Sequence, residues 1–218
     1  MTENGQLITQ VPRLHADAFA GAFELLTTTL RLNGGQAGTR VVSVTAPRAK
    51  DGASTVAGNL AVTVAATGRK VLLVDANFRA PALHQLFHVN PRPGLAEVLA
   101  RGASVNDVIQ AGRVPNLWVL AAGAMTGSPH GRLESHELDA VFEHLRSRYD
   151  FIVVDTPPVL QYADALHLAR VTNGTLLVLS DGAPLRGAQE ARRRFDRVQA
   201  NVLGVVMNRG DPKVGAGA

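Results

Sequence analysis

Short runs of consecutive apolar residues recur along the chain, and most are rich in Val, Leu and Ile. The runs lie at 41–45, 71–75, 117–120, 151–155, 174–180 and 202–207. Runs without polar alternation are typical of strands whose two faces are both covered. Segments with helical spacing, such as 54–66 and 134–147, separate them. The pattern predicts an α/β fold, a doubly wound and mostly parallel sheet with helices on both faces.

An amphipathic helix is predicted ahead of the first run. Residues 15–32 place apolar side chains at Phe19, Phe23, Leu26 and Leu30, and a pair of glycines follows. We therefore divide the chain into 1–39, an N-terminal helical segment packed on the domain; 40–209, the main domain; and 210–218, a Gly-rich tail expected to be flexible.

Composition excludes several classes of protein. The 218 residues are 46% hydrophobic, which is enough for a core, and contain no Cys, which excludes disulfides, thiol nucleophiles and thiolate zinc sites. The net charge of +4 is spread along the chain, so no nucleic-acid partner is predicted. We find neither an apolar stretch of bilayer length nor a signal peptide, and we expect a cytoplasmic protein.

The arginine cluster at 186–197 and the histidines do not by themselves indicate a binding site. The arginines between Arg186 and Arg197 are interpreted as a solvated helix face, or alternatively as a face that meets an anionic membrane or an acidic partner. Seven histidines show no convincing ligand arrangement; His84 and His88 have helical spacing but no acidic partner. No metal site is predicted from the histidines.

Polar residues end three of the predicted strands. Thr45 leads into a Gly-containing loop, and Asp75 and Asp155 each close an apolar run. Buried carboxylates are costly, so an acid in this position usually faces a polar site. Ligands of parallel sheets bind beyond the carboxyl ends of the strands. The two acids therefore predict a metal–nucleotide site at that edge of the sheet.

The loop between the first strand and its helix corresponds to a phosphate-binding loop. Its standard pattern is G-x-x-x-x-G-K-[ST], in which backbone amides and the Lys hold phosphates and the hydroxyl binds Mg²⁺. Gly52 and Ser54 match this pattern. Pro47 replaces the first Gly, and Ala53 replaces the Lys. The pattern alone is too incomplete to assign the loop.

Longer motifs carry a resemblance to a known family. Residues 71–81 read VLLVDANFRAP, and residues 149–159 read YDFIVVDTPPV. The sequence resembles the cytoplasmic kinase domain of the bacterial tyrosine kinases (BY-kinases) of capsule and exopolysaccharide systems, which are relatives of the MinD/ParA ATPases with a deviant P-loop. Further matches cover nearly the whole chain: Gly94-Leu95, Val98-Leu99, Asp164, 174–180 and 204–209. The resemblance implies a P-loop NTPase fold of the MinD/ParA type, with 40–209 as the kinase-like domain.

The resemblance further implies a site for ATP or ADP with Mg²⁺. The expected catalytic carboxylates are Asp75, as base or metal-proximal acid, and Asp155, as a further metal acid. Asp155 as a helix-cap or ion-pair residue remains an alternative. The expected metal-binding residues are Ser54, Asp75, Asn77 and Asp155. The expected nucleotide-binding residues are Arg48, Lys50, Asp51, Gly52, Ala53, Ser54, Thr55, Arg79, Asn208 and Arg209. For Arg79, a structural salt bridge to a neighbouring loop is an equal alternative to a phosphate or partner contact.

Four positions depart from the family pattern. Ala53 removes the phosphate-binding cation, and Arg48 or Lys50 is the candidate replacement. Asn77 stands where the D-x-D-x-R-x-P motif has its second acid. The ring-forming motif E-x-x-R-x-x-R lacks both arginines in either register, at Asp17, Ala20 and Phe23 or at Gly21, Glu24 and Thr27. The two tyrosines, Tyr149 and Tyr162, lie inside folded motifs, so the family's C-terminal phosphate acceptor is not expected.

These departures favour a degenerate member of the family. We expect a nucleotide-poor regulator of exopolysaccharide assembly, at the inner face of the membrane, that docks on a membrane polysaccharide co-polymerase, the chain-length adaptor. A homo-oligomer remains open, although a ring of the family type is not expected. The alternatives are an active ATP-dependent tyrosine kinase that uses Arg48 or Lys50, and a MinD/ParA-type positioning ATPase. A dinucleotide-binding enzyme is less well supported, because no G-x-G-x-x-G follows the first strand.

Overall fold

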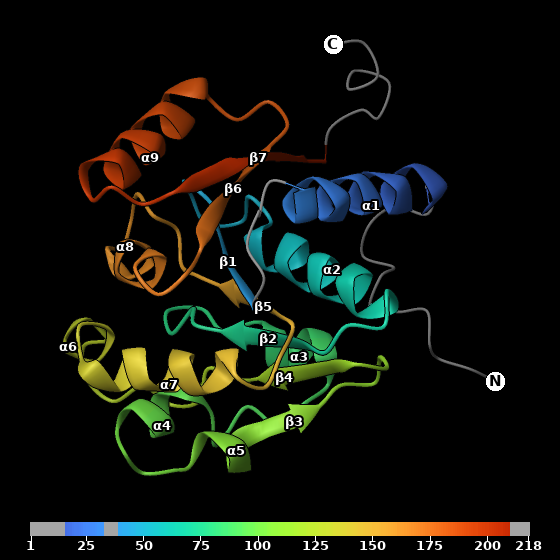
Figure 1. Cartoon of the computed structure of the whole chain (residues 1–218). Helices are drawn as coiled ribbons and strands as arrows, with labels where there is room; N and C mark the ends of the chain where they lie inside the picture. The colour runs from blue at the N-terminus through green and yellow to red at the C-terminus, as the bar shows by residue number, and fades with distance from the viewer. Residues whose placement is uncertain (1–15, 33–38, 210–218) are drawn as a thin grey trace.

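The structure, a computed structural model, describes residues 16–32 and 39–209, with side chains described within 21–30 and 39–209 (Figure 1). Its strands are β1 Arg40–Thr45, β2 Val71–Asp75, β3 Ile109–Ala111, β4 Leu117–Leu120, β5 Phe151–Asp155, β6 Gly174–Ser180 and β7 Val202–Asn208. Its helices are α1 Ala16–Leu32, α2 Ala53–Ala66, α3 Leu83–Phe87, α4 Leu95–Leu99, α5 Val105–Val108, α6 His130–Leu133, α7 His136–Arg146, α8 Asp164–Ala169 and α9 Leu185–Arg197. Some sequence predictions concern positions outside the described residues. These are the segments 1–15 and 210–218 and the side chains of Asp17, Phe19 and Ala20.

The strands form one seven-stranded sheet in the order β3-β4-β2-β5-β1-β6-β7. Every neighbouring pair is parallel except β3 and β4, which are antiparallel. The predicted α/β class with a mostly parallel sheet is confirmed. Because the parallel strands share one direction, Thr45, Asp75, Asp155, Ser180 and Asn208 end at the same edge of the sheet.

Helices cover both faces of the sheet, because alternate strand residues point to opposite sides. Val42 and Val44 of β1 pack with α1, α2 and α3 in one core cluster. Val41 belongs to the opposite cluster, with α4, α5, α6 and α7. Figure 1 shows α1 and α2 on one side of the central strands and α7 and α9 on the other. This double coverage explains the continuous apolar runs of the inner strands. The expectation that 202–207 is also buried is wrong, because β7 is an edge strand with Val205 and Met207 exposed.

The N-terminal helix α1 packs against α2 through the predicted apolar positions. Phe23 and Leu30 are buried in the cluster that contains Leu60 and Val64 of α2, and Leu26 packs at its margin. The opposite side of α1 is exposed at Leu25. In the part of the chain that the structure describes, no helix is long and apolar enough to cross a bilayer.

Candidate nucleotide site

The loop between β1 and α2 has the backbone shape of an anion-binding turn. Lys50 has a φ of 71° and Gly52 a φ of 98°, both in the left-handed region, and Gly52 is the N-cap of α2. Helix α2 then begins at Ala53, and its first amides have no carbonyl within the helix to bond. The amide groups of Ala53, Ser54 and Thr55 can therefore receive an anion at the positive end of the helix dipole.

The far side of this loop is held by β6 and β7. The Asn208 side chain donates from Nδ2 to the carbonyl oxygen of Asp51 at 3.0 Å. The Ser180 hydroxyl donates to Oδ1 of Asp51 at 3.2 Å, and the Arg48 amide donates to Oδ2 at 3.2 Å. A Cβ atom built on Gly52 would lie 1.9 Å from Asn208 Nδ2. Gly52 is thus required both by its φ and by the close approach of Asn208.

Two carboxylates meet at the carboxyl ends of β2 and β5. Asp75 and Asp155 are paired in register across these neighbouring strands, and both are fully buried. Burial raises the pKa of Asp75 to about 6. Burial and the nearby Asp75 charge raise the pKa of Asp155 well above its ordinary value. The prediction that the two acids lie on neighbouring strands is confirmed, and their charges repel.

The two carboxylates differ in their partners. Asp75 accepts three backbone N–H bonds, from Asn77 at 3.1 Å, Ala82 at 3.1 Å and Leu83 at 3.0 Å. Neither oxygen of Asp155 has a hydrogen-bond partner among the described residues. The nearby Ser54 hydroxyl and Thr156 amide lower the pKa of Asp155 against the rise from burial, although no hydrogen bond of normal geometry joins either group to its carboxylate. Asp75 thus fixes the loop that follows β2, while Asp155 keeps both oxygens free.

These free oxygens fit a hard divalent cation. A buried carboxylate without a hydrogen bond is costly unless a cation compensates it. Ser54, at the start of α2, supplies a hydroxyl beside Asp155. Mg²⁺ would therefore be held by Asp155 and Ser54, with phosphate oxygens on the amides of the α2 N-terminus. When bound, Mg²⁺ would neutralise phosphate charge, while the amides of the α2 N-terminus would orient the phosphates and Asp155 and Ser54 would hold the metal.

The other predicted residues of the second motif have partners within the fold. Asn77 is buried and accepts the Ala80 amide through Oδ1 at 3.1 Å. Arg79 forms two hydrogen bonds with the buried Asp164, at 3.0 and 3.3 Å, and its guanidinium lies 4.7 Å from the Tyr162 ring centroid. Arg79 therefore joins the loop after β2 to the start of α8. The structure brings it to Asp164 rather than to the phosphate loop.

The predicted cations of the phosphate loop point to solvent. Arg48 and Lys50 are exposed, and no ion pair holds either side chain among the described residues. Ala53 offers only a methyl group at the start of α2. Arg209 directly follows β7 with a φ of 64°, at the same edge of the sheet. Within the described chain, no basic side chain is bonded into the phosphate loop.

The DTPP segment runs beside the chain that leaves β1. The Thr156 amide donates to the Val44 carbonyl at 3.0 Å, and the Val159 amide donates to the Ala46 carbonyl at 2.9 Å. The Thr45 hydroxyl donates to the Pro157 carbonyl at 2.9 Å. These bonds position the start of the phosphate loop against β5. The motif therefore fixes the distance between the loop and Asp155.

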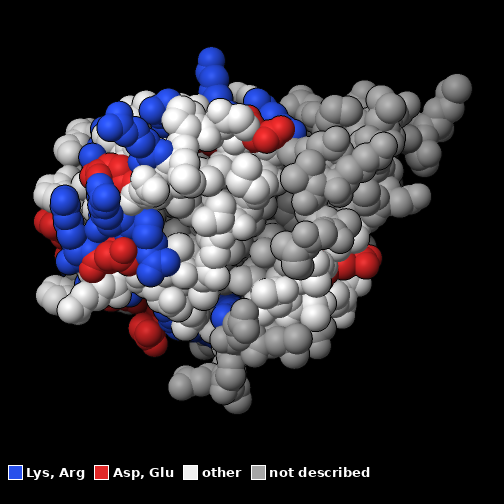
Figure 2. Space-filling model, turned by 90° about the horizontal axis from the view of Figure 1, so that it is seen from above, with Lys and Arg blue, Asp and Glu red and all other residues white. Residues whose placement is uncertain are grey.

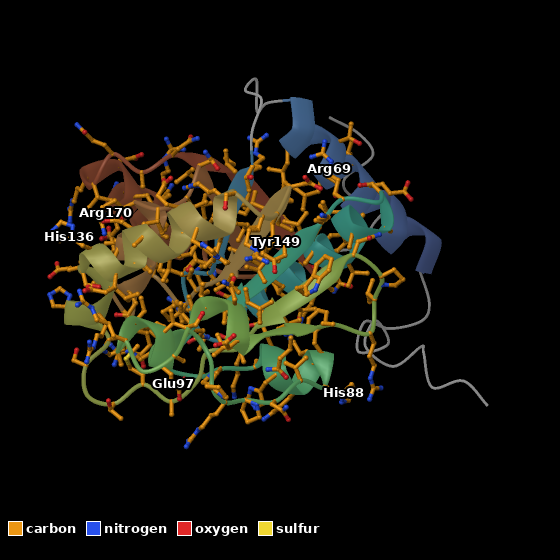
Figure 3. All side chains as sticks on the ribbon, turned by 60° about the horizontal axis from the view of Figure 1, so that its bottom comes forward. Arg69, His88, Glu97, His136, Tyr149 and Arg170 are labelled. Atoms are coloured by element: carbon orange, nitrogen blue, oxygen red, sulfur yellow. The ribbon has the colours of Figure 1, made fainter. Side chains whose placement is uncertain are left out.

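Sequence reasoning did not identify Glu97 of α4 as a supporting residue. Its carboxylate accepts the Gly94 amide at 2.8 Å and the Ala124 amide at 3.0 Å. Glu97 thus joins α4 to the segment after β4. Both Glu97 and Tyr149 are labelled in Figure 3. Tyr149 packs edge-on against Trp118, with ring centroids 5.7 Å apart. The available signal was half of a capping box, a Glu three residues after the N-cap Gly94.

The arginines of α9 form a mixed-charge surface. Figure 2 shows Lys and Arg side chains gathered over one side of the molecule, with acidic side chains between them. Arg192 pairs with Asp196 at 2.7 Å, and Glu190 lies near Arg193 and Arg194 at 3.9 and 3.7 Å. Internal pairing of this kind is typical of a solvated helix face. Within the described residues, Arg186 and Arg197 have no ion-pair partner.

The family profile described as an AAA domain matches residues 39–202, most of the chain. The tyrosine-protein kinase YwqD of Bacillus subtilis is 35% identical over 168 residues, 77% of this chain and 71% of that kinase. This chain belongs to the bacterial tyrosine-kinase family. A longer relative, the tyrosine-protein kinase homologue EpsB of Ralstonia solanacearum, is 34% identical over 217 residues. The match covers 96% of this chain but only 29% of the length of EpsB.

A further relative and two solved structures extend this kinase comparison. The succinoglycan biosynthesis transport protein ExoP of Rhizobium meliloti is 33% identical over 179 residues, 79% of this chain and 22% of that protein. The kinase domain of Escherichia coli tyrosine kinase ETK superposes with a TM-score of 0.85 at 28% identity, covering 90% of this chain and 77% of that one. MinD of Pyrococcus horikoshii, solved with Mg-ADP, has a TM-score of 0.68 at 27% identity, covering 78% and 70%. The expected P-loop fold of the MinD/ParA type is confirmed.

Proposed function

We propose that this BY-kinase homologue has a nucleotide site impaired for phosphoryl transfer and acts as a regulator of exopolysaccharide or capsule export. The observation that carries the proposal is Ala53 at the first position of α2, where the P-loop pattern has a Lys. Loss of one group that stabilises transferring charge typically costs about 10²–10³ in rate. The other elements of the site, the amides of the α2 N-terminus and the Asp155 oxygens, are retained.

The role in polysaccharide export is supported by the relatives. ExoP is named as a succinoglycan biosynthesis transport protein, and it shares 33% identity with this chain. We infer that the chain works at the inner face of the membrane, on the cytoplasmic tail of a polysaccharide co-polymerase. The unpaired Arg186 and Arg197 of α9 are available to an anionic membrane or an acidic partner. The other arginines of α9 pair with acidic side chains of the same helix, so the positive charge that α9 offers to such a surface is small.

The competing function is an active tyrosine kinase in which Arg48 or Lys50 replaces the missing Lys. The observation in its favour is that both side chains are exposed on the loop and therefore free to turn toward a bound phosphate. A variant with both Arg48→Ala and Lys50→Ala tests this role. Unchanged nucleotide affinity in that variant excludes both residues as the replacement.

Transfer of phosphate from ATP to a tyrosine-rich peptide distinguishes the two functions. We expect transfer by the natural chain to be at least about 10²-fold slower than transfer by Ala53→Lys. Ala53→Lys combined with Asp155→Asn is the matched negative control, because it restores the cation and removes the metal carboxylate. Equal transfer by the natural chain and Ala53→Lys would contradict the impaired site and favour the active kinase.

Docking is tested separately from catalysis. The cytoplasmic tail of a polysaccharide co-polymerase from the same organism is titrated into the chain without nucleotide. The proposal predicts binding that neither ATP nor Asp155→Asn changes. If binding appears only with Mg-ATP, the partner contact follows nucleotide state, as it would in a positioning ATPase, and the regulator proposed here is wrong.

A further inference from the structure

Two histidines and a glutamate converge on the face of the sheet that carries α6, α7 and α8. His130 and Glu134 stand four residues apart, at the start of α6 and at its C-cap, and His167 lies on α8. His130 Nε2 is 3.5 Å from one Glu134 oxygen, and His167 Nδ1 is 3.7 Å from the other. One ligand atom of each residue lies within 4.8 Å of those of the other two.

The backbone that carries this cluster is anchored in the core. Leu133 of α6 and Leu168 of α8 are fully buried in the same hydrophobic cluster. The two imidazole rings lie edge to face, with centroids 4.9 Å apart. Figure 1 shows α6 and α8 as neighbours at the same end of the molecule. The cluster therefore joins two packed helices that are far apart in the sequence.

The donor set matches a borderline transition metal. Two imidazoles and one carboxylate form a three-ligand zinc site whose fourth position is open to water. Tetrahedral coordination at about 2.0–2.1 Å places neighbouring ligand atoms about 3.3 Å apart. His130 Nε2 and His167 Nδ1 lie 3.5 and 3.7 Å from different oxygens of Glu134, so the carboxylate must turn to present one oxygen to a metal held by both rings. The side chains of His130 and Glu134 are 58% and 52% exposed, so they can turn inward without moving the core.

We propose that His130, Glu134 and His167 form a Zn²⁺ site that joins α6 to α8. The site is separate from the nucleotide site, whose carboxylate and hydroxyl ligands suit Mg²⁺. Helix α8 starts at Asp164, which holds Arg79 of the loop after β2. Zinc therefore stabilises the part of the fold that supports that loop. The inference goes beyond the proposed function, since it concerns no residue of the phosphate loop.

Calorimetric titration of Zn²⁺ into the full chain at pH 7.5, with excess Mg²⁺ to saturate the nucleotide site, tests this proposal. We expect one Zn²⁺ per chain. His130→Ala and His167→Ala should each weaken Zn²⁺ binding by at least about tenfold, since each removes a ligand. Co²⁺ in place of Zn²⁺ should give the visible absorption of a tetrahedral site in the natural chain and lose it in both variants.

Matched controls come from histidines outside the cluster. His136→Ala removes an exposed imidazole of α7, and His88→Asn removes one at the opposite end of the molecule while tolerating its left-handed φ of 52° (Figure 3). Both controls should bind Zn²⁺ like the natural chain. Absence of Zn²⁺ binding by the natural chain, or binding that survives the combined His130→Ala and His167→Ala changes, overturns the proposal. Circular dichroism verifies that each variant is folded.

Discussion

Asp75 and Asp155 are register partners of β2 and β5, but only the Asp75 oxygens accept hydrogen bonds from backbone amides. Two buried acids side by side destabilise a fold unless a cation or a proton compensates them. The backbone holds the Asp75 carboxylate, and we propose that the Asp155 carboxylate is left for a metal.

Asp155→Asn should stabilise the chain while weakening metal binding. The change removes a buried carboxylate without a hydrogen-bond partner, so we expect the free energy of unfolding at pH 7.5 to rise on the order of 1 kcal/mol. Urea unfolding measures this, with the exposed Asp107→Asn as the control expected to change little. A lower stability in Asp155→Asn would show that the Asp155 carboxylate is compensated within the fold.

The pH dependence of stability should carry the signature of the buried pair. Because the pKa of Asp75 is raised to about 6, the folded chain binds more protons than the unfolded chain between about pH 4 and pH 6. The contribution of this group to the free energy of unfolding therefore falls as pH rises through that window. The difference in stability between Asp155→Asn and the natural chain should grow with pH. A difference that is constant from pH 4.5 to pH 7.5 would contradict the raised pKa values.

The Arg79–Asp164 ion pair should respond unequally to loss of either partner. Asp164 is 4% exposed and Arg79 is 34% exposed, so Arg79→Ala leaves a buried charge while Asp164→Ala leaves a side chain that can turn to solvent. We expect Arg79→Ala to cost about 2 kcal/mol of unfolding free energy and Asp164→Ala about 1 kcal/mol. Urea unfolding of the two single variants and the double variant measures the coupling. Equal costs that add in the double variant would mean that the pair contributes nothing.

Gly52→Ala should be more costly than Gly68→Ala, although both positions have a left-handed φ. A Cβ at Gly68 meets no atom within 4 Å, while a Cβ at Gly52 meets Asn208. Gly68→Ala should therefore cost about 1 kcal/mol of stability through its φ alone. Gly52→Ala should cost more, and Asn208→Ala in the same chain should recover part of the excess. Identical melting temperatures for the two single variants would exclude the close approach of Asn208.

The sequence predicted the elements whose residues are buried on both faces. All six apolar runs are strands. Five lie inside the sheet, where continuous Val, Leu and Ile suit strands covered on both faces, but the sixth, β7, is an edge strand with Val205 and Met207 exposed. The strand β3 was not predicted, since it is three residues long and antiparallel at the sheet edge. The predicted helix at 134–147 is α7, His136–Arg146, preceded by a separate α6, because the extended backbone of Ser135 interrupts the helical path between them.

The site was predictable where the end of an apolar run or a local loop motif marks it in the sequence. The pairing of Asp75 with Asp155 follows from two strand ends, and the phosphate loop follows from one local motif. The different partners of the two acids depend on amides at Ala82 and Leu83, which no sequence pattern places. The histidine cluster was missed because His167 reaches Glu134 only through the packing of α8 on α6.

The most direct test is calorimetric titration of Mg-ADP into the natural chain and into Ala53→Lys. A charged contact to phosphate is worth about 1.5–3 kcal/mol, so Ala53→Lys should bind at least about tenfold more tightly than the natural chain. That result would establish Ala53 as the cause of an impaired site. Equally tight binding by both chains would contradict the account and leave a working nucleotide site in the natural protein.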